Sequence, residues 1–237
     1  MLVSTLTETG VLSASVFFGE MDSTTCLAMA VAEVGAENVL ALSVYYGQKH
    51  DKEIQAAKKV AEYYGVRRME LDLSVIFSGS NCSLLKQSTE EIPLESYAQQ
   101  IEETHGEKPV STYVPFRNGL FLSSAASIAL SHDCSKIMYG AHADDAAGAA
   151  YPDCSLDFVN AMNQAIYLGS GNQLTIEAPF VSLTKADVVK KGLELGVPYD
   201  LTWSCYEGGE KPCGKCGTCI DRMKAFEKNG TIDPLLK

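Results

Sequence analysis

Four cysteines near the carboxyl end of the chain have the spacing of a metal site. Cys205, Cys213, Cys216 and Cys219 fall within fifteen residues, separated by seven, two and two positions. Structural zinc takes four tetrahedral ligands, and a Cys-x-x-Cys turn aims two thiolates at one ion. Because four thiolates leave no open position for substrate or water, a closed structural zinc site is expected. The alternative is a pair of disulfides or a redox-active Cys-x-x-Cys.

A glycine-bearing turn near the amino end is a candidate anion-binding site. An apolar run of strand length, residues 11–18, is followed by Gly-Glu-Met-Asp-Ser-Thr-Thr and a helix-like stretch, residues 26–34. Free N–H groups at the start of a helix bind phosphate or carboxylate. Asp22, Ser23 and Thr24 are also good N-cap residues, so a capped helix without ligand explains the same pattern. The turn lacks the lysine of a Walker A loop, which excludes that class of nucleotide site.

Two short polar segments flank other predicted elements. Gln48 and His50 follow an apolar run where the carboxyl end of a strand is expected. His50 is a candidate acid or base, although a lone loop histidine is more often only solvated or hydrogen bonded. Arg117 and Asn118 precede an Ala- and Ser-rich stretch predicted to be a helix. Arg117 could clamp a carboxylate or phosphate through two hydrogen bonds, or form a structural ion pair.

A third polar segment follows the predicted strand at residues 136–139. It contains His142, Asp144, Asp145 and Tyr151, followed by Asp153, in a glycine-bearing loop. So many titratable groups exceed what a connecting loop requires, and loops at the ligand edge of a sheet carry binding and catalytic residues. The segment is therefore a candidate substrate site.

These groups must be positioned by a doubly wound α/β fold. The chain alternates strands and helices, which predicts a mainly parallel sheet with ligands beyond the carboxyl ends of its strands. The predicted strands are residues 11–18, 39–45, 68–73, 136–139 and 174–178, and the predicted helices are 26–34, 51–64, 119–130, 156–168, one starting near 184, and 221–227. Ser182, Thr184 and Asp187 are expected to cap the penultimate helix. Residues 77–115 form an excursion over the ligand edge.

Length and composition indicate one α/β domain at residues 1–200, with a zinc-binding segment, 201–237, packed on it. The chain has 237 residues, of which 46% are hydrophobic. The net charge of −11 argues against direct nucleic-acid binding, so a small-molecule substrate is expected. No apolar run approaches the roughly 20 residues that span a membrane, and residues 1–10 do not resemble a signal peptide. A reducing cytoplasm suits the cysteines.

Several motifs together resemble the QueC-type 7-cyano-7-deazaguanine synthases of the PP-loop ATP pyrophosphatase superfamily. The resemblance covers nearly the whole chain, from about residue 13 to residue 236. The motifs that carry it, in chain order, are Asp22-Ser-Thr-Thr-Cys-Leu27, Tyr46-Gly-Gln-Lys-His50, Val114-Pro-Phe-Arg-Asn118, Gly140-Ala-His-Ala-Asp144, Tyr151-Pro-Asp-Cys154, Ala178-Pro-Phe180, Thr184-Lys-Ala-Asp187 and Ser204-Cys-Tyr206 through Cys219.

The resemblance implies ATP-dependent conversion of 7-carboxy-7-deazaguanine and ammonia into 7-cyano-7-deazaguanine, through an acyl-adenylate and an amide. It implies ATP, Mg²⁺ and one structural zinc as cofactors, and a homodimer. The residues that it assigns to ATP are Phe18, Gly19, Glu20, Met21, Asp22, Ser23 and Thr24. Those assigned to the deazaguanine are Gln48, His50, Arg117, Asn118, His142, Asp144, Tyr151 and Asp153, with Asp22, Ser23, Arg117 and His142 as catalytic candidates. The four thiols would bind zinc.

The loop departs from the family pattern at two positions. The family loop is Ser-Gly-Gly-x-Asp-Ser, whereas this chain has Phe18 at the first position and Glu20 at the third. Phe18 removes a hydroxyl, and Glu20 adds negative charge where the triphosphate is expected, so ATP binding should weaken. An active synthase would have Glu20 turned outward or helping to hold magnesium. The alternatives are an enzyme that joins the activated acid to another amine, such as a protein, and a deazaguanine-binding protein without ATP.

Overall fold

A five-stranded parallel sheet forms the centre of the molecule. The computed structural model describes residues 12–16, 20–103, 105 and 108–236. The strands are β1 (Leu12–Val16), β2 (Val39–Tyr45), β3 (Arg67–Asp72), β4 (Cys134–Met138) and β5 (Thr175–Glu177), in the order β3-β2-β1-β4-β5. All neighbouring strands pair parallel, which confirms the predicted doubly wound α/β fold.

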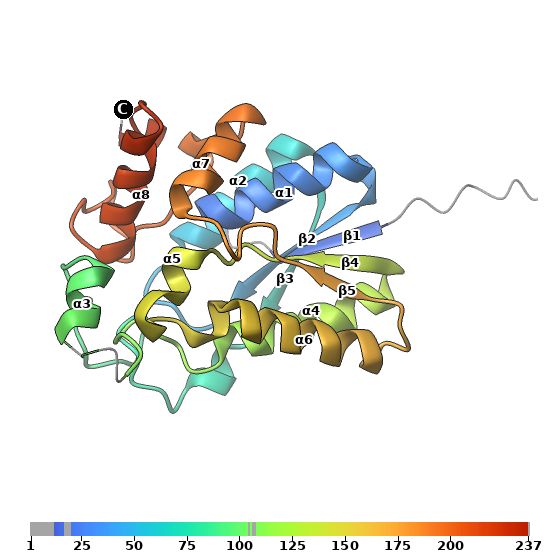
Figure 1. Cartoon of the computed structure of the whole chain (residues 1–237), viewed down its shortest axis with the longest axis horizontal. Helices are drawn as coiled ribbons and strands as arrows, with labels where there is room; N and C mark the ends of the chain where they lie inside the picture. Colours follow the sequence, from blue (N-terminus) through green and yellow to red (C-terminus); the bar gives the residue numbers. More distant parts are fainter. Residues whose placement is uncertain (1–11, 17–19, 104, 106–107, 237) are drawn as a thin grey trace, which may run out of the picture.

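Helices cover both faces of this sheet. Helices α1 (Met21–Val34), α2 (Lys52–Tyr64) and α7 (Lys185–Glu194) lie on one face, and α4 (Arg117–Ser131) and α6 (Leu156–Gly169) lie on the other (Figure 1). The shorter α3 (Tyr97–Glu103) and α5 (Ala143–Ala146), with α8 (Gly217–Lys228), lie toward the carboxyl ends of the strands. This is the edge where parallel sheets bind ligands.

The predicted element bounds are close except at the starts of α1 and of α8, which begins at Gly217 rather than at residue 221. The strand at residues 39–45 matches β2, and the other described strand ends differ by one or two residues. Helix α1 begins at Met21 rather than near residue 26, and its N-cap is Glu20. The expectation that Asp22, Ser23 or Thr24 caps this helix is therefore wrong. Thr24 lies in the first turn, and its hydroxyl donates a 2.6 Å hydrogen bond to the Glu20 carbonyl.

Helix α7 begins as its sequence predicts. The Thr184 side chain accepts a hydrogen bond from the Asp187 backbone, and the Asp187 carboxylate accepts one from the Thr184 backbone. This capping box satisfies two otherwise unpaired donors at the helix start, which is worth about 1 kcal/mol. The capping box therefore fixes the backbone position of Lys185, the first residue of α7, from which the lysine side chain extends.

The C-terminal segment is held on the domain by a buried ion pair. Arg222 of α8 donates to the Asp233 carboxylate at 2.7 Å and to the Tyr199 carbonyl at 3.0 Å. The Tyr199 hydroxyl lies 2.8 Å from the Thr25 hydroxyl of α1. Since both charged groups are almost wholly buried and hydrogen bonded, removing one partner would leave an uncompensated charge. The contacts tie α8 and the cysteine segment to the start of α1.

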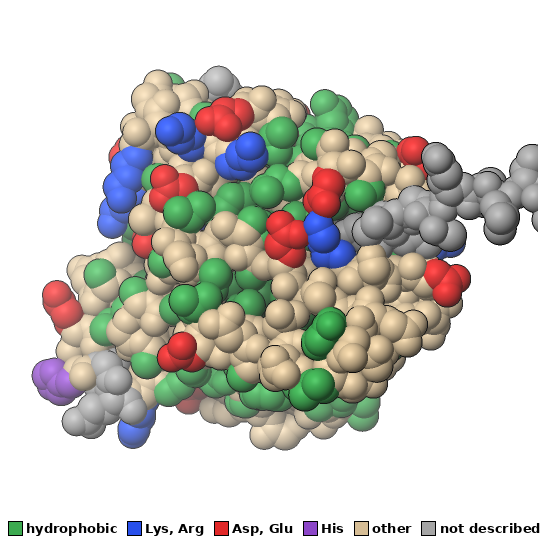
Figure 2. Space-filling model, turned by 45° about the vertical axis from the view of Figure 1, so that its right-hand side comes forward, with side chains coloured by type: hydrophobic (Ala, Val, Ile, Leu, Met, Phe, Trp, Pro, Cys, Tyr) green, Lys and Arg blue, Asp and Glu red, His purple; other side chains and the backbone are tan. Residues whose placement is uncertain are grey.

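The surface carries mixed charges. Figure 2 shows one face, on which Lys and Arg side chains are interspersed with Asp and Glu around small apolar areas. Within the described part of the chain, no helix has the length and apolar character needed to cross a membrane.

Candidate active site

The start of α1 meets the end of β4 at very close range. A Cβ atom added to Gly140, just after β4, would lie 3.0 Å from the Ser23 backbone nitrogen. Few Cβ atoms tolerate that separation from backbone, so glycine allows the two segments to approach. The approach directs the first turn of α1, whose N–H groups carry partial positive charge, toward the ligand edge of the sheet.

Two adjoining cavities lie at this junction. The first, of about 70 Å³, is lined by Glu20, Asp22, Ser23, Tyr46, Glu53, Arg117, Asn118, Tyr139, Gly140, Ala141, Asp145 and Cys154. The second, of about 50 Å³, shares several of these residues and adds Tyr97, Tyr151, Lys185, Tyr206 and Thr218. Segments that are far apart in sequence therefore contribute to one polar site. Phe18 and Gly19, two of the predicted ATP-binding residues, lie outside the described residues.

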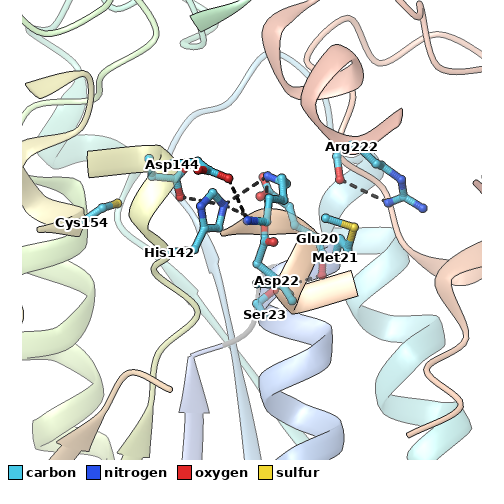
Figure 3. A network of polar contacts seen from close by, with 12 residues as sticks. Glu20, Met21, Asp22, Ser23, His142, Asp144, Cys154 and Arg222 are labelled. Atoms are coloured by element: carbon cyan, nitrogen blue, oxygen red, sulfur yellow. Dashed lines mark hydrogen bonds and ion pairs between the residues drawn. The ribbon is translucent and has the colours of Figure 1, made fainter. Parts of the chain in front are cut away.

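A buried charge network forms one wall of the site. The Lys185 ammonium lies 3.2 Å from Asp22 Oδ2 and 3.3 Å from His142 Nε2. His142 Nε2 also lies 3.2 Å from Asp145 Oδ2, and Figure 3 shows the His142 ring beside Asp22. Burial opposes ionisation of Asp22, but its interactions with the Lys185 charge and with His142 outweigh that effect, so its pKa is lowered. Lys185 is buried too, yet Asp22 and Asp145 raise its pKa and keep it charged.

Arg117 presents its guanidinium to the cavity. The group stacks on the ring of Tyr46, 5.0 Å from its centroid, and on Phe121 at 5.8 Å. Among the described residues Arg117 has no ion pair within 4.0 Å, which disfavours the structural ion pair considered from the sequence. Burial alone would lower its pKa, but Tyr46 and Glu20 raise it, so the group is charged. The planar guanidinium, held by stacking on these rings, can donate two parallel hydrogen bonds to a carboxylate ligand.

Asn118 and Asp153 hold the start of α4. The Asn118 backbone donates a 2.9 Å hydrogen bond to Asp153 Oδ2, and its side-chain amide reaches the Asp153 carbonyl at 3.4 Å. Burial raises the pKa of Asp153, while its hydrogen bonds to Asn118 and the Arg117 charge act in the opposite direction. Asp153 thus fixes the backbone from which Arg117 projects.

The Glu20 carboxyl faces the cavities. It is not turned outward, which was one of the two arrangements expected of an active synthase. Burial raises its pKa to about 7, with Asp22 and Asp145 adding to the effect and Lys185 and Arg117 opposing it. Glu53, near the start of α2, lines the same cavity with 3% of its surface exposed. Its pKa is raised well above the usual range, first by burial and then by Glu20.

Some predicted site residues line a cavity and others do not. Of the first turn of α1, Met21 is fully buried in the core. The Gln48 side chain accepts a hydrogen bond from the Tyr46 backbone, and His50 packs against Gly208 of the cysteine segment. The Asp144 carboxylate accepts a hydrogen bond from the Lys185 backbone at the start of α7. These side chains therefore support neighbouring segments rather than lining the two cavities.

Tyr151 belongs to a hydroxyl cluster in the second cavity. Its hydroxyl lies 2.5 Å from that of Thr112, and its ring packs edge-on against Tyr97. The Tyr97 hydroxyl lies 2.6 Å from that of Tyr206. The cluster joins the excursion, the loop after β4 and the cysteine segment around one ligand space.

Sequence reasoning missed three side chains that shape the site. Glu53 stands three residues after His50 at the start of a predicted helix, a position at the ligand edge that could have been recognised. Lys185 lies inside the family motif Thr184-Lys-Ala-Asp187, to which only a helix-capping role was assigned. Tyr46 is the residue directly after β2, and it supplies the ring on which Arg117 stacks.

The four cysteines of the C-terminal segment converge. Their sulfur atoms all lie within 4.8 Å of one another, and none is in a disulfide. The edges of a tetrahedral zinc–thiolate site are about 3.8 Å long, given Zn–S bonds of about 2.3 Å. The Cys213 sulfur accepts backbone hydrogen bonds from Lys215 at 3.4 Å and Cys216 at 3.3 Å. Such donors stabilise thiolates, so the residues fit a single metal ion.

A solved structure shares this fold. Over 93% of this chain and 67% of the other, the structure resembles the U34-tRNA thiolase NcsA from Methanococcus maripaludis, described with its [4Fe-4S] cluster, with a TM-score of 0.50 and 16% identity. That likeness concerns the fold alone.

Sequence comparison identifies the family. Residues 13–230 match the model of the queuosine biosynthesis protein QueC. The chain is 43% identical to the 7-cyano-7-deazaguanine synthase of Archaeoglobus fulgidus over 219 residues, which cover 92% of this chain and 87% of that one. It is 42% identical to that of Oceanobacillus iheyensis over 230 residues, covering 96% and 98%. The chain belongs to the QueC family, as its motifs predicted.

Proposed function

We propose that the protein is an ATP-dependent 7-cyano-7-deazaguanine synthase. ATP adenylates the carboxylate of 7-carboxy-7-deazaguanine, ammonia displaces AMP to give an amide, and a second ATP activates the amide for dehydration to the nitrile. The observation that carries the proposal is the uncommitted Arg117 guanidinium facing the N-terminal turn of α1 across one cavity. One group suits a carboxylate and the other suits a phosphate, which are the two partners of an adenylation.

The charges around the cavity support a division of roles. Arg117 holds the substrate carboxylate, and its stacking on Tyr46 fixes the plane of the guanidinium. The start of α1 and the Lys185 ammonium stabilise the charge that develops on the departing pyrophosphate. Asp22 and His142 position Lys185, and Asp153 positions the segment that carries Arg117. The family implies Mg²⁺ with the nucleotide, and Asp22 Oδ1, which is buried and unpaired among the described residues, is a candidate ligand.

The four converging thiolates hold one structural zinc in this proposal. The ion would fix the segment that carries Tyr206 into the second cavity, and it would take no part in the chemistry. Cys205, Cys213, Cys216 and Cys219 supply all four ligands.

A second candidate function follows from the position of Glu20. A carboxylate that faces the expected triphosphate site repels it, so the protein could bind the deazaguanine acid without consuming ATP. This candidate predicts binding of the acid with no nucleotide dependence. Joining the activated acid to another amine, such as a protein, is the related enzymatic alternative.

Activation of the acid distinguishes these functions. The purified protein is incubated with Mg²⁺, ATP, labelled pyrophosphate and 7-carboxy-7-deazaguanine whose carboxylate carries ¹⁸O. A synthase or a conjugating enzyme returns label to ATP only when the acid is present. A synthase then transfers ¹⁸O to AMP when ammonium is added, whereas a conjugating enzyme does so only when its own amine is supplied. Binding of the acid without exchange would identify the binding protein instead.

A further inference from the structure

Glu53 is a buried carboxyl that faces the first cavity without a protein partner. Only 3% of its surface is exposed, and it lines the cavity beside Tyr46. Among the residues that the structure describes, the Glu53 carboxyl makes no hydrogen bond and no ion pair. Buried polar groups are nearly always hydrogen bonded, because an unpartnered one has lost its hydration without compensation. This exception indicates that a bound molecule supplies the partner.

The position of Glu53 in its helix does not explain its burial. Glu53 is the second residue of α2, where a negative charge interacts favourably with the helix dipole. Asp157 has the same position in α6, and its side chain is exposed. The dipole interaction is therefore available to an exposed acid, and burial of the carboxyl costs more free energy than that interaction returns.

Arg117 lines the same cavity, yet it does not pair with Glu53. Burial and then Glu20 raise the pKa of Glu53, and Arg117 lowers it, but no ion pair within 4.0 Å joins the two groups. The Arg117 guanidinium is held instead over the Tyr46 ring, 5.0 Å from its centroid. The cavity therefore presents a cation and an acid that are kept apart. This arrangement suits a ligand with a carboxylate at one end and N–H donors at the other.

The acid of the proposed reaction has both of these features. Its carboxylate suits the Arg117 guanidinium. Its pyrimidine ring carries N1–H and a 2-amino group on one edge, and these two donors point in the same direction. A carboxylate has two acceptor oxygens and no donor, so it can accept both hydrogen bonds at once. Such donors favour the ionised carboxylate and oppose the effect of burial on Glu53.

We propose that the Glu53 carboxylate accepts hydrogen bonds from N1–H and the 2-amino group of the deazaguanine, and so makes the site specific for a guanine-type edge. The inference rests on the proposed function and names the residue that selects the base. With Arg117 at one end and Glu53 at the other, the acid is held in one orientation, which directs its carboxylate toward the start of α1. An analogue without the 2-amino group leaves one Glu53 oxygen buried and unpaired, so it binds more weakly.

Binding of two acids tests this assignment. They are 7-carboxy-7-deazaguanine and its analogue without the 2-amino group, each titrated calorimetrically into the protein without nucleotide. Asp157→Asn is the matched control for Glu53→Gln, because both variants neutralise the second residue of a helix. The unmodified protein and Asp157→Asn should bind the first acid about 10- to 100-fold more tightly. In Glu53→Gln this preference should fall about tenfold, because an amide replaces one acceptor with a donor.

Three results would overturn the proposal. The first is equal binding of the two acids by the unmodified protein, which needs no variant. The second is a Glu53→Gln protein that keeps the preference or weakens both acids equally. The third is a Glu53→Gln protein that loses affinity for ATP and keeps the preference, since Glu53 would then bind the adenine amino group. Both variants should melt within about 4 °C of the unmodified protein, which excludes unfolding as the cause.

This test does not depend on turnover. If the protein prefers the first acid but never returns label from pyrophosphate to ATP, the proposed function fails while the role of Glu53 stands. In an active synthase the same preference is measured as the ratio of kcat/KM for the two acids. A ratio near one would refute the role of Glu53 while the proposed function stands. An inactive protein that binds neither acid would refute both.

Discussion

Lys185 Nζ lies 3.2 Å from Asp22 Oδ2, and both residues are more than nine-tenths buried. The pair joins the first residue of α7 to the first turn of α1 at the ligand edge of the sheet. It places a positive charge beside the N-terminal turn of α1, where the proposed reaction releases pyrophosphate. The same contact therefore contributes to folding and to the proposed chemistry.

Replacing Lys185 with methionine should strongly destabilise the protein. The change leaves the Asp22 carboxylate buried without its main counter-charge, and breaking a buried pair in this way costs about 3–5 kcal/mol. The free energy of unfolding in urea measures the loss. Asp22→Asn combined with Lys185→Met should recover much of it, because no buried charge then remains unpaired. A double variant as unstable as the single one would argue against the ion pair as the cause.

Glu20 should make stability fall as pH rises. Its pKa is about 7 in the folded protein and 4.5 when unperturbed, so the folded state holds more protons between these values. Stability is therefore lost progressively from about pH 4.5 to pH 7, by on the order of 3 kcal/mol. Glu20→Gln should be more stable than the unmodified protein at pH 8, and equally stable at pH 4. A gain that does not depend on pH would contradict this account, and exposed Glu62→Gln is the control.

Glu20→Gly, which restores the residue of the family loop, should strengthen ATP binding. Removing a negative charge from the expected triphosphate site should lower KM for ATP about tenfold. Steady-state kinetics with ATP varied measures this constant, and exposed Glu62→Gln is the control. An unchanged KM for ATP in Glu20→Gly would contradict the position given to the Glu20 carboxylate.

The cysteine segment should hold one zinc ion and no iron–sulfur cluster. A four-iron cluster spreads its thiolates widely, because each thiolate binds a different iron, whereas these sulfurs lie within 4.8 Å of one another. Metal analysis should give one zinc per chain and no visible absorption. Cys216→Ser should lose the zinc and unfold at a lower temperature, since binding of a structural metal stabilises the fold. Iron and sulfide in the purified protein would contradict the assignment.

The sequence predicted best those elements whose signal is local. Strand β2 is an apolar run interrupted only by Ser43, it is buried on both faces, and its bounds agree with the prediction. The start of α1 was placed late because Asp22 and Thr24 have the composition of caps, whereas Thr25 bonds back to the Met21 carbonyl at 2.9 Å inside the helix. Hydroxyl bonds of this kind are decided by the surrounding structure and not by residue type.

The polar groups of the site were found only in part for the same reason. Arg117 was recognisable because it stands beside a predicted helix start at the ligand edge. Lys185 was not, because its partner Asp22 is remote in sequence and its own neighbours form a capping box. Glu53 was missed because a glutamate in the first turn of an amphipathic helix ordinarily faces solvent, and only the folded chain buries it beside Glu20.

Formation of the nitrile tests the central claim most directly. The unmodified protein is incubated with 7-carboxy-7-deazaguanine, ATP, Mg²⁺ and ammonium, and the products are identified by mass spectrometry beside a Phe18→Ser, Glu20→Gly double variant. The account predicts 7-cyano-7-deazaguanine and two AMP per nitrile from the unmodified protein. No amide, nitrile or AMP from it, at any ammonium concentration and in the presence of bound acid, would contradict the assignment as a synthase.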